Sequence, residues 1–364
     1  MARYTHLDSP MQLGELQLRN GMVMAPCTRC FCPGFLPTRD MAAYYARRAA
    51  SGVGLIISEG TVVCQRGSGY PDVPGIWSDG QVRAWRPVTQ AVHEAGGRMA
   101  CQLWHVGAVA HPVTTGGPLP ESPSGLSPEG PVRRLRGAHG EALHYGASEA
   151  MSATRIKEVV EIFAAAAGRA LEAGFDAVEI HGAHGYLIDQ FINLSWNMRE
   201  DEWGGQGRCR LAEDITRAVV AEAGPGRVIF RFSPATGASG KVWKRPTETL
   251  PLLLDTLWGA GLRILHASHG NFDAPCVPAE LAPLAQASPD GMVPLHAATR
   301  AHWQGQIIGV GSLSPGRADE ALAAGEVDAC AFGRLLIANP DLPSRMRMDL
   351  DPRPYDPAML ETLF

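Results

Sequence analysis

Two histidines and a tyrosine, His181, His184 and Tyr186, lie close together directly after the apolar run at residues 177–180. Such a run is typical of a buried parallel strand. Enzymes built on parallel sheets keep their catalytic groups where these strands end. Each of the three rings can donate a hydrogen bond near neutral pH, so together they could polarise and protonate a substrate carbonyl group.

The same histidines could instead bind a metal ion, because two imidazoles three residues apart on a turn can share one. In that segment only Glu179 or Asp189 could complete the ligand set, so a metal-dependent hydrolase is an alternative on residue types alone. The eight cysteines are scattered, and the cluster Cys27, Cys30 and Cys32 has no second Cys/His pair at zinc-site spacing. We therefore expect free thiols and no metal.

Three polar residues occur where strand patterns call for apolar ones. Gln102 and Arg231 interrupt apolar runs, and Glu59 ends one. A buried, unpaired guanidinium is so unfavourable that Arg231 must meet an anion or several acceptors. One explanation is an internal ion pair with Glu179. The other is a ligand whose polar edges reach the catalytic end of the sheet.

The elements that must position these residues follow a regular alternation of short apolar runs and amphipathic segments, in eight strand-then-helix units. Parallel strands need crossover connections, so this order predicts an α/β fold, closed as a single (β/α)8 TIM barrel. An open doubly wound sheet is the rival, but no strand is followed by the Gly-x-Gly-x-x-Gly turn. The predicted strands are residues 22–25, 54–58, 98–103, 177–180, 228–232, 263–266, 307–310 and 328–332, and the predicted helices are residues 40–50, 81–95, 154–173, 208–223, 247–261, 297–303, 315–324 and 335–348.

Two segments depart from this regularity. Residues 105–151 are rich in Gly, Pro and Ser and too long for a routine loop, which indicates a lid or excursion after the third strand. Residues 233–246 form a shorter insertion of similar composition. Neither has the character of a separate domain, so residues 1–364 are expected to form one.

The loops after the seventh and eighth strands contain Gly311-Ser312 and Gly333-Arg334. Small residues there let backbone amides approach a phosphate, and Arg334 can pair with it. These two loops are the usual phosphate site of a TIM barrel. The sequence therefore predicts a phosphorylated ligand at this end of the barrel.

The composition excludes other classes of partner. With 32 Lys and Arg against 37 Asp and Glu, the chain has a net charge of -5 and no basic excess for binding nucleic acid. No apolar run approaches the roughly 20 residues of a membrane span, and the first residues lack the apolar core of a signal peptide. We expect a cytoplasmic protein, monomeric or homodimeric, that acts on a small molecule.

Motifs along nearly the whole chain resemble the Old Yellow Enzyme family of FMN-dependent ene-reductases. The matches are residues 20–29, 44–49, 75–77, 102–107, 181–191, 197–205, 332–334 and 339–342. The resemblance implies a (β/α)8 barrel with FMN at its C-terminal mouth. It also implies that NAD(P)H donates hydride and that the C=C bond of an α,β-unsaturated carbonyl or nitro compound is reduced, with nicotinamide and substrate using the same pocket in turn.

By this resemblance, His181 and His184 bind the oxygen of the substrate's activating group, Tyr186 protonates the α-carbon, and Trp104 lines the substrate side. The chemistry is sound on its own terms. Adding hydride to the β-carbon builds negative charge on the oxygen, and two preplaced donors stabilise that charge. A phenol, with an ordinary pKa of about 10, is protonated at neutral pH and can act as an acid.

The resemblance also implies the cofactor contacts. Thr28 would touch the flavin O4 region, Gln102 the pyrimidine edge, and Arg231 would place positive charge near N1. The remaining contacts would come from small residues and one arginine, namely Ala25, Pro26 and Gly60 along the ring and Gly311, Ser312, Gly333 and Arg334 at the phosphate.

The chain departs from the family pattern at places that could border the substrate pocket. One branch of the family has a flavin-tuning cysteine where Thr28 stands, and residues 105–151 and 233–246 match poorly. Oxidation of an amine or desaturation of a ring on the same flavin is therefore an alternative, as is a flavin carrier without catalytic function.

Overall fold

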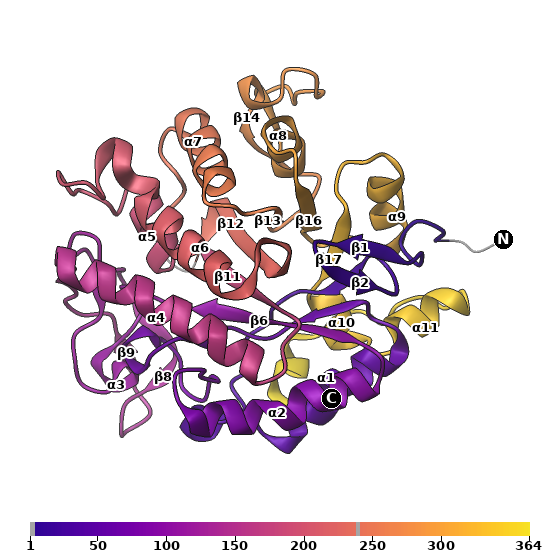
Figure 1. Ribbon diagram of the computed structural model, residues 1–364, viewed down its shortest axis with the longest axis horizontal. Helices are drawn as coiled ribbons and strands as arrows, with labels where there is room; N and C mark the ends of the chain where they lie inside the picture. The colour runs from indigo at the N-terminus through magenta and orange to yellow at the C-terminus, as the bar shows by residue number, and fades with distance from the viewer. Residues whose placement is uncertain (1–3, 238–240) are drawn as a thin grey trace.

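Eight parallel strands close into a barrel in the computed structural model, which describes residues 4–237 and 241–364 (Figure 1). Strand β11 pairs with β12 on one side and with β6 on the other, which completes the ring. Each barrel strand falls on one of the eight predicted segments, so the predicted TIM barrel is confirmed. The strands are β3 (Met22–Met24), β4 (Leu55–Ile57), β6 (Arg98–Trp104), β11 (Ala177–His184), β12 (Val228–Gly237), β13 (Ile264–Ser268), β16 (Gln306–Val310) and β17 (Ala329–Phe332).

Helices follow the strands on the outside of the barrel, with α1 beside α2 and α4 beside α6 (Figure 1). Ser78, Ser152 and Ser314 cap the N-termini of α2, α4 and α9 by accepting a backbone N–H three residues on, as serines before helices are suited to do. The helices are α1 (Arg39–Ser51), α2 (Asp79–Glu94), α4 (Ala153–Glu172), α6 (Arg210–Ala223), α7 (Pro246–Gly259), α8 (Leu295–His302), α9 (Pro315–Ala323), α10 (Arg334–Ala338) and α11 (Leu342–Arg347).

The prediction of one helix over residues 335–348 is wrong. Two short helices, α10 and α11, occupy this stretch, and Asn339 between them is non-helical with φ -131° and ψ 79°. Pro340 is the physical reason, because proline lacks an N–H and disfavours helical geometry in the residue before it.

The amino end of the barrel is closed by the hairpin of β1 (Met11–Leu13) and β2 (Leu16–Leu18). Leucines of this hairpin belong to the same buried cluster as the barrel-interior residues Val23, Ile229 and Ile308. The hairpin is also bonded to the barrel through the Gly14 amide, which donates to Gln306 Oε1 at 2.6 Å. A ligand must therefore enter from the carboxyl ends of the strands.

Residues 105–151 form an ordered excursion next to that open end. It contains α3 (Pro112–Thr115) and the strands β7 (Glu121–Ser122), β8 (Pro131–Arg136), β9 (Ala142–His144) and β10 (Glu149–Ala150). Strands β8 and β9 form a hairpin, while β7 pairs with β10 and so joins the start of the excursion to its end. Buried Glu121 fixes it to the barrel by accepting from Arg155 and His105.

Two further segments lie next to the carboxyl ends of the strands. Within the predicted insertion at residues 233–246, β12 extends to Gly237 and Trp243 is buried, whereas residues 238–240 lie outside the described part of the chain. A hairpin of β14 (Pro275–Pro278) and β15 (Met292–Pro294) separates β13 from α8, and the sequence analysis did not anticipate it. In the described residues, no helix is both long and apolar enough to cross a membrane.

Candidate active site

A bulge at the end of β11 brings both histidines to the barrel mouth. Side chains alternate along a strand, so His181 and His184 would point to opposite faces if β11 were regular. Instead, the pairing of β11 with β12 shifts register between Gly182 and His184, and His184 has φ 61°. A non-glycine residue in this left-handed region carries backbone strain, which is common at functional sites. The ring centroids of the two histidines are consequently only 5.3 Å apart.

Hydrogen bonds from neighbouring groups orient both imidazoles. The Ala183 amide donates to His181 Nδ1 at 3.3 Å, which leaves the His181 proton on Nε2. Ser268 Oγ accepts from Arg231 Nη2 at 3.0 Å and lies 3.1 Å from His184 Nε2, so it holds the His184 ring in place. A neutral imidazole carries one N–H, so each ring can donate one hydrogen bond.

Tyr186 completes the donor set. Its ring centroid is 5.1 Å from that of His181 and 5.0 Å from that of Trp104, in edge-to-face contacts with both. The Trp104 ring also stacks over His181 at 6.1 Å. The structure thus brings together all four residues that were predicted to face the substrate, at the ends of β6 and β11.

The protonation states suit hydrogen-bond donation and proton transfer. Burial, together with the positive charge of Arg231, lowers the pKa of His181 and His184 well below the usual range, so both imidazoles are neutral at pH 7. Burial raises the pKa of Tyr186 well above its usual value, so its phenol is protonated. Two neutral imidazoles and one protonated phenol therefore lie side by side.

The ion pair considered between Arg231 and Glu179 does not form, although the structure describes both residues. The two oxygens of Glu179 are hydrogen-bonded to Gln102 Nε2 at 2.8 Å and to His266 Nδ1 at 2.6 Å. All three side chains are buried. Arg231 is only 7% exposed, and its Nε has no hydrogen-bond partner. The second explanation, a ligand at the barrel mouth, is the one that the buried guanidinium favours.

A cavity of about 280 Å³ runs from the histidine end of the mouth to the loops after β16 and β17. Its described lining carries two guanidinium groups, Arg231 and Arg334, and no carboxylate, so it suits an anionic ligand. Eight predicted site residues line it, namely Ala25, Pro26, His184, Arg231, Gly311, Ser312, Gly333 and Arg334.

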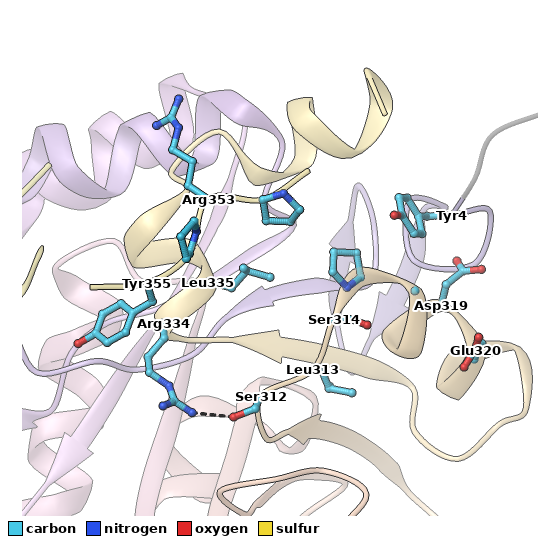
Figure 2. A pocket seen from close by; sticks show the side chains of 14 residues that line it. Tyr4, Ser312, Leu313, Ser314, Asp319, Glu320, Arg334, Leu335, Arg353 and Tyr355 are labelled. Carbon is cyan, nitrogen blue, oxygen red and sulfur yellow. Dashed lines mark hydrogen bonds between the residues drawn. The ribbon is translucent and has the colours of Figure 1, made fainter. Parts of the chain in front are cut away.

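At the rim of this cavity, Arg334 Nη2 donates to Ser312 Oγ at 2.6 Å (Figure 2). Ser312 Oγ in turn donates to the Gly270 carbonyl at 2.9 Å. Gly311 and Ser312 have φ of 151° and 50°, so the backbone turns sharply there. A second cavity, of about 850 Å³, begins on the other side of the same pair and also includes Arg353 (Figure 2). Carboxylates line this second cavity, which makes the smaller one the better anion site.

The Arg334 side chain gives a direct test of the phosphate site. Arg334→Gln is expected to raise the Kd for FMN about tenfold while leaving the Kd for riboflavin, which lacks the phosphate, unchanged. Fluorescence titration of the apoprotein with each flavin measures both constants. Arg353→Gln is the matched control, because Arg353 lines only the larger cavity. Equal weakening of FMN and riboflavin by Arg334→Gln would contradict the assignment.

Three predicted cofactor residues lie outside the lining of the smaller cavity. Gly60 contacts Trp104 so closely that a Cβ there would collide with the indole ring. Gln102 is buried at the end of β6 and holds Glu179. Thr28 is half-buried in the segment after β3. These positions are adjacent to the histidine end, and their contact with flavin stays a prediction.

The sequence analysis missed three residues that hold the catalytic groups. Ser268 lies at the carboxyl end of β13, two residues past the predicted strand end, where a hydroxyl could have been recognised as a site residue. Tyr70 contacts Tyr186 from a loop, with only the following proline as a local signal. Asp189 was weighed only as a metal ligand. In the described residues, no group of three or more His, Cys, Asp or Glu side chains is arranged to hold a metal ion.

Asp189 fixes the catalytic turn to the 233–246 insertion. It lies in α5 (Leu187–Ile192), and its carboxylate accepts from the Gly185 amide and from Trp243 Nε1, both at 2.6 Å. Burial raises the pKa of Asp189 to about 7. Both hydrogen bonds partly offset the unfavourable burial of the ionised form.

This raised pKa predicts a pH-dependent stability. The folded-state pKa exceeds the ordinary value of about 3.9, so the contribution of Asp189 to stability is lost as the pH rises through 7. From pH 5 to pH 8 the free energy of unfolding should fall by on the order of 2 kcal/mol more in the wild type than in Asp189→Asn. Denaturant unfolding of both proteins at each pH measures the difference. Parallel pH profiles would rule out a buried titrating carboxyl here.

Taken together, the fold and the donor set define a barrel enzyme that binds an anionic cofactor and activates a polar double bond. The family model for the NADH:flavin oxidoreductase / NADH oxidase family matches residues 6–352, and the chain belongs to this family. It is an FMN-dependent flavin oxidoreductase that uses NAD(P)H, as the resemblance implied.

Individual relatives agree over nearly the whole chain. The sequence is 37% identical to 12-oxophytodienoate reductase 7 of Oryza sativa subsp. japonica over 353 residues, 94% of this chain and 88% of the relative. The fold is similar to the old yellow enzyme homologue from Zymomonas mobilis, with a TM-score of 0.88, 35% identity and coverage of 98% and 97% of the two chains. It is also similar to morphinone reductase in complex with tetrahydroNAD, with a TM-score of 0.85, 37% identity and coverage of 98% and 94%. Two of these relatives are named as reductases, which favours reduction over amine oxidation or metal-dependent hydrolysis.

Proposed function

We propose that this chain reduces the C=C bond of α,β-unsaturated carbonyl or nitro compounds, with residues 1–364 acting as one FMN-binding barrel and residues 105–151 as its lid. The observation that carries the proposal is the donor set of His181, His184 and Tyr186. The ring centroids of His184 and Tyr186 lie 5.3 Å and 5.1 Å from that of His181. Two neutral imidazoles can stabilise an oxygen that gains negative charge, and a protonated phenol can give a proton to a carbon.

The residues present fit FMN. Arg231 offers a buried, unpartnered Nε at one end of the cavity, and Arg334 with Ser312 offers donors for a phosphate at the other. Between these ends the walls are small or apolar, including Ala25 and Pro26, which leaves room for a flat ring. When bound, FMN supplies hydride transfer, from NAD(P)H to the cofactor and then to the β-carbon of the substrate.

The protein's own groups then have distinct tasks. The N–H groups of His181 and His184 hold the carbonyl or nitro oxygen and stabilise the negative charge that develops on it. Tyr186 gives its proton to the α-carbon. Arg231, held by Ser268, keeps a positive charge at the pyrimidine edge of the cofactor site. Trp104 closes the site beside the two rings that it contacts.

The remaining properties are proposed from bulk features. All eight cysteines are free thiols, which supports a reducing compartment such as the cytoplasm. The net charge of -5 supports a small-molecule substrate over a nucleic acid. A monomer or a homodimer is compatible with a site built from one chain.

Anaerobic spectroscopy of the purified protein tests the proposal. We expect the visible absorbance of oxidised flavin, its rapid loss on adding NAD(P)H, and its return on adding 2-cyclohexenone. A colourless protein that does not take up FMN, or a flavin that is bleached by amines and not reoxidised by any enone or nitroalkene, would refute it.

A further inference from the structure

A second tyrosine lies directly behind the proton donor. The hydroxyl oxygens of Tyr70 and Tyr186 are 3.1 Å apart, and either could be the donor in the free enzyme. Once a substrate takes the Tyr186 proton, Tyr186 can only accept from Tyr70. A hydrogen bond in that direction stabilises the phenolate that forms on Tyr186 as its proton leaves.

Tyr70 is held in this position by packing that a phenylalanine would reproduce. It is 6% exposed and stacks on Trp104 with ring centroids 5.5 Å apart. Val62, Val73 and Val106 belong to the same buried cluster. The ring thus fills an apolar space, and the hydroxyl is the part of the side chain that reaches a reacting group.

The excursion packs against this pair. Tyr145, which follows β9, is half-buried and packs against the same cluster as Tyr70 and Tyr186. The two tyrosines therefore share a cluster with a partly exposed residue of the excursion.

Turnover needs a route by which a proton reaches Tyr186, because Tyr186 is buried. Its phenolate must regain a proton before the next substrate can be reduced, and burial makes that phenolate unfavourable. Among the described residues, the Tyr186 hydroxyl is hydrogen-bonded to Tyr70.

We propose that Tyr70 is a positioning residue that donates to the Tyr186 oxygen during proton transfer, and that Tyr186 regains its proton from solvent through Tyr70. This inference rests on the proposed function of Tyr186. The Tyr186 O–H bond breaks as the α-carbon C–H bond forms. The Tyr186 oxygen next takes the Tyr70 proton, and the Tyr70 oxygen takes one from water, with no electrons transferred.

Tyr70→Phe tests the positioning role, because it removes one oxygen and keeps the ring. Reduction of an enone by the NAD(P)H-reduced enzyme should be about tenfold slower in single turnover, with a larger solvent deuterium isotope effect. Bleaching by NAD(P)H should be unchanged. Reoxidation by ferricyanide, which needs no proton on carbon, should also keep the wild-type rate. A merely structural role would slow ferricyanide and enone alike, and this result would overturn the proposal.

Steady-state turnover of Tyr70→Phe tests the return of the proton. It should fall further below the wild type than the single-turnover rate does, and it should recover when a small acid such as imidazolium is added. An equal loss in both assays, without recovery, would overturn the return of the proton through Tyr70.

Tyr44→Phe is the matched control for Tyr70→Phe, because Tyr44 is a buried tyrosine whose hydroxyl has no partner. It should behave as the wild type in every assay. The wild-type enzyme separates this inference from the proposed function. If it reduces no enone, the proposed function fails. If it does and Tyr70→Phe matches it in rate and isotope effect, only the inference about Tyr70 fails.

Discussion

Tyr186→Phe is expected to slow reduction of an enone by the NAD(P)H-reduced enzyme about 100- to 1,000-fold, which is what a general acid contributes. The variant keeps the ring contacts with His181 and Trp104 and loses the hydroxyl group, which carries the proton and the hydrogen bond to Tyr70. Stopped-flow mixing of the reduced enzyme with 2-cyclohexenone, without oxygen, measures this rate directly.

Reduction of the flavin by NAD(P)H, the other half of the reaction, is the control for Tyr186→Phe. Hydride transfer from NAD(P)H needs no acid, so bleaching of the flavin should proceed at the wild-type rate in the variant. An enone rate within about threefold of the wild type would contradict the acid role. It would instead favour a flavin carrier or a proton drawn directly from water.

Arg231→Met has the second large expected effect. The Kd for FMN should rise about 10- to 100-fold, because hydrogen bonds to a charged group in a buried site are worth about 1.5–3 kcal/mol. The apoprotein should lose no stability, since a buried guanidinium whose Nε has no partner is replaced by an apolar side chain of similar length. Fluorescence titration with FMN and thermal unfolding of the apoprotein measure the two quantities.

Arg208→Met is the matched control for Arg231→Met. Arg208 is also buried and its Nε is also unpartnered, but among the described residues it makes two hydrogen bonds, to the Gly205 carbonyl and to Thr249 in the outer layer of the barrel, whereas Arg231 makes one, to Ser268. Its replacement should destabilise the fold and leave the Kd for FMN unchanged. If Arg231→Met destabilised the apoprotein and bound FMN normally, Arg231 would be a structural residue and not a cofactor contact.

Much of the barrel could be predicted from the sequence because the pattern that specifies it is local. Each barrel strand is a short apolar run, and burial of both faces requires that run whatever surrounds it. Capping serines such as Ser78 and Ser314 are equally local signals. The β14/β15 hairpin carried no such run and was missed, and the break at Pro340 was overlooked although proline is itself a local signal.

The site was predictable where one residue violated a local rule. Arg231 was identified because a charge interrupts an apolar run, and the structure places it beside His184 and Ser268. The partners were not predictable, since Ser268 and Tyr70 come from distant segments. The bulge that turns His184 toward His181 depends on the pairing of β11 with β12, which no pattern within β11 reveals.

The position of isotope in the product tests the central claim, that one hydride and one proton are added across an activated C=C bond. 2-Cyclohexenone would be reduced in D2O with unlabelled NAD(P)H, and in H2O with nicotinamide deuterated at C4. The account predicts deuterium at the α-carbon in the first case and at the β-carbon in the second. An allylic alcohol, with the C=C bond intact and the carbonyl reduced, would contradict it.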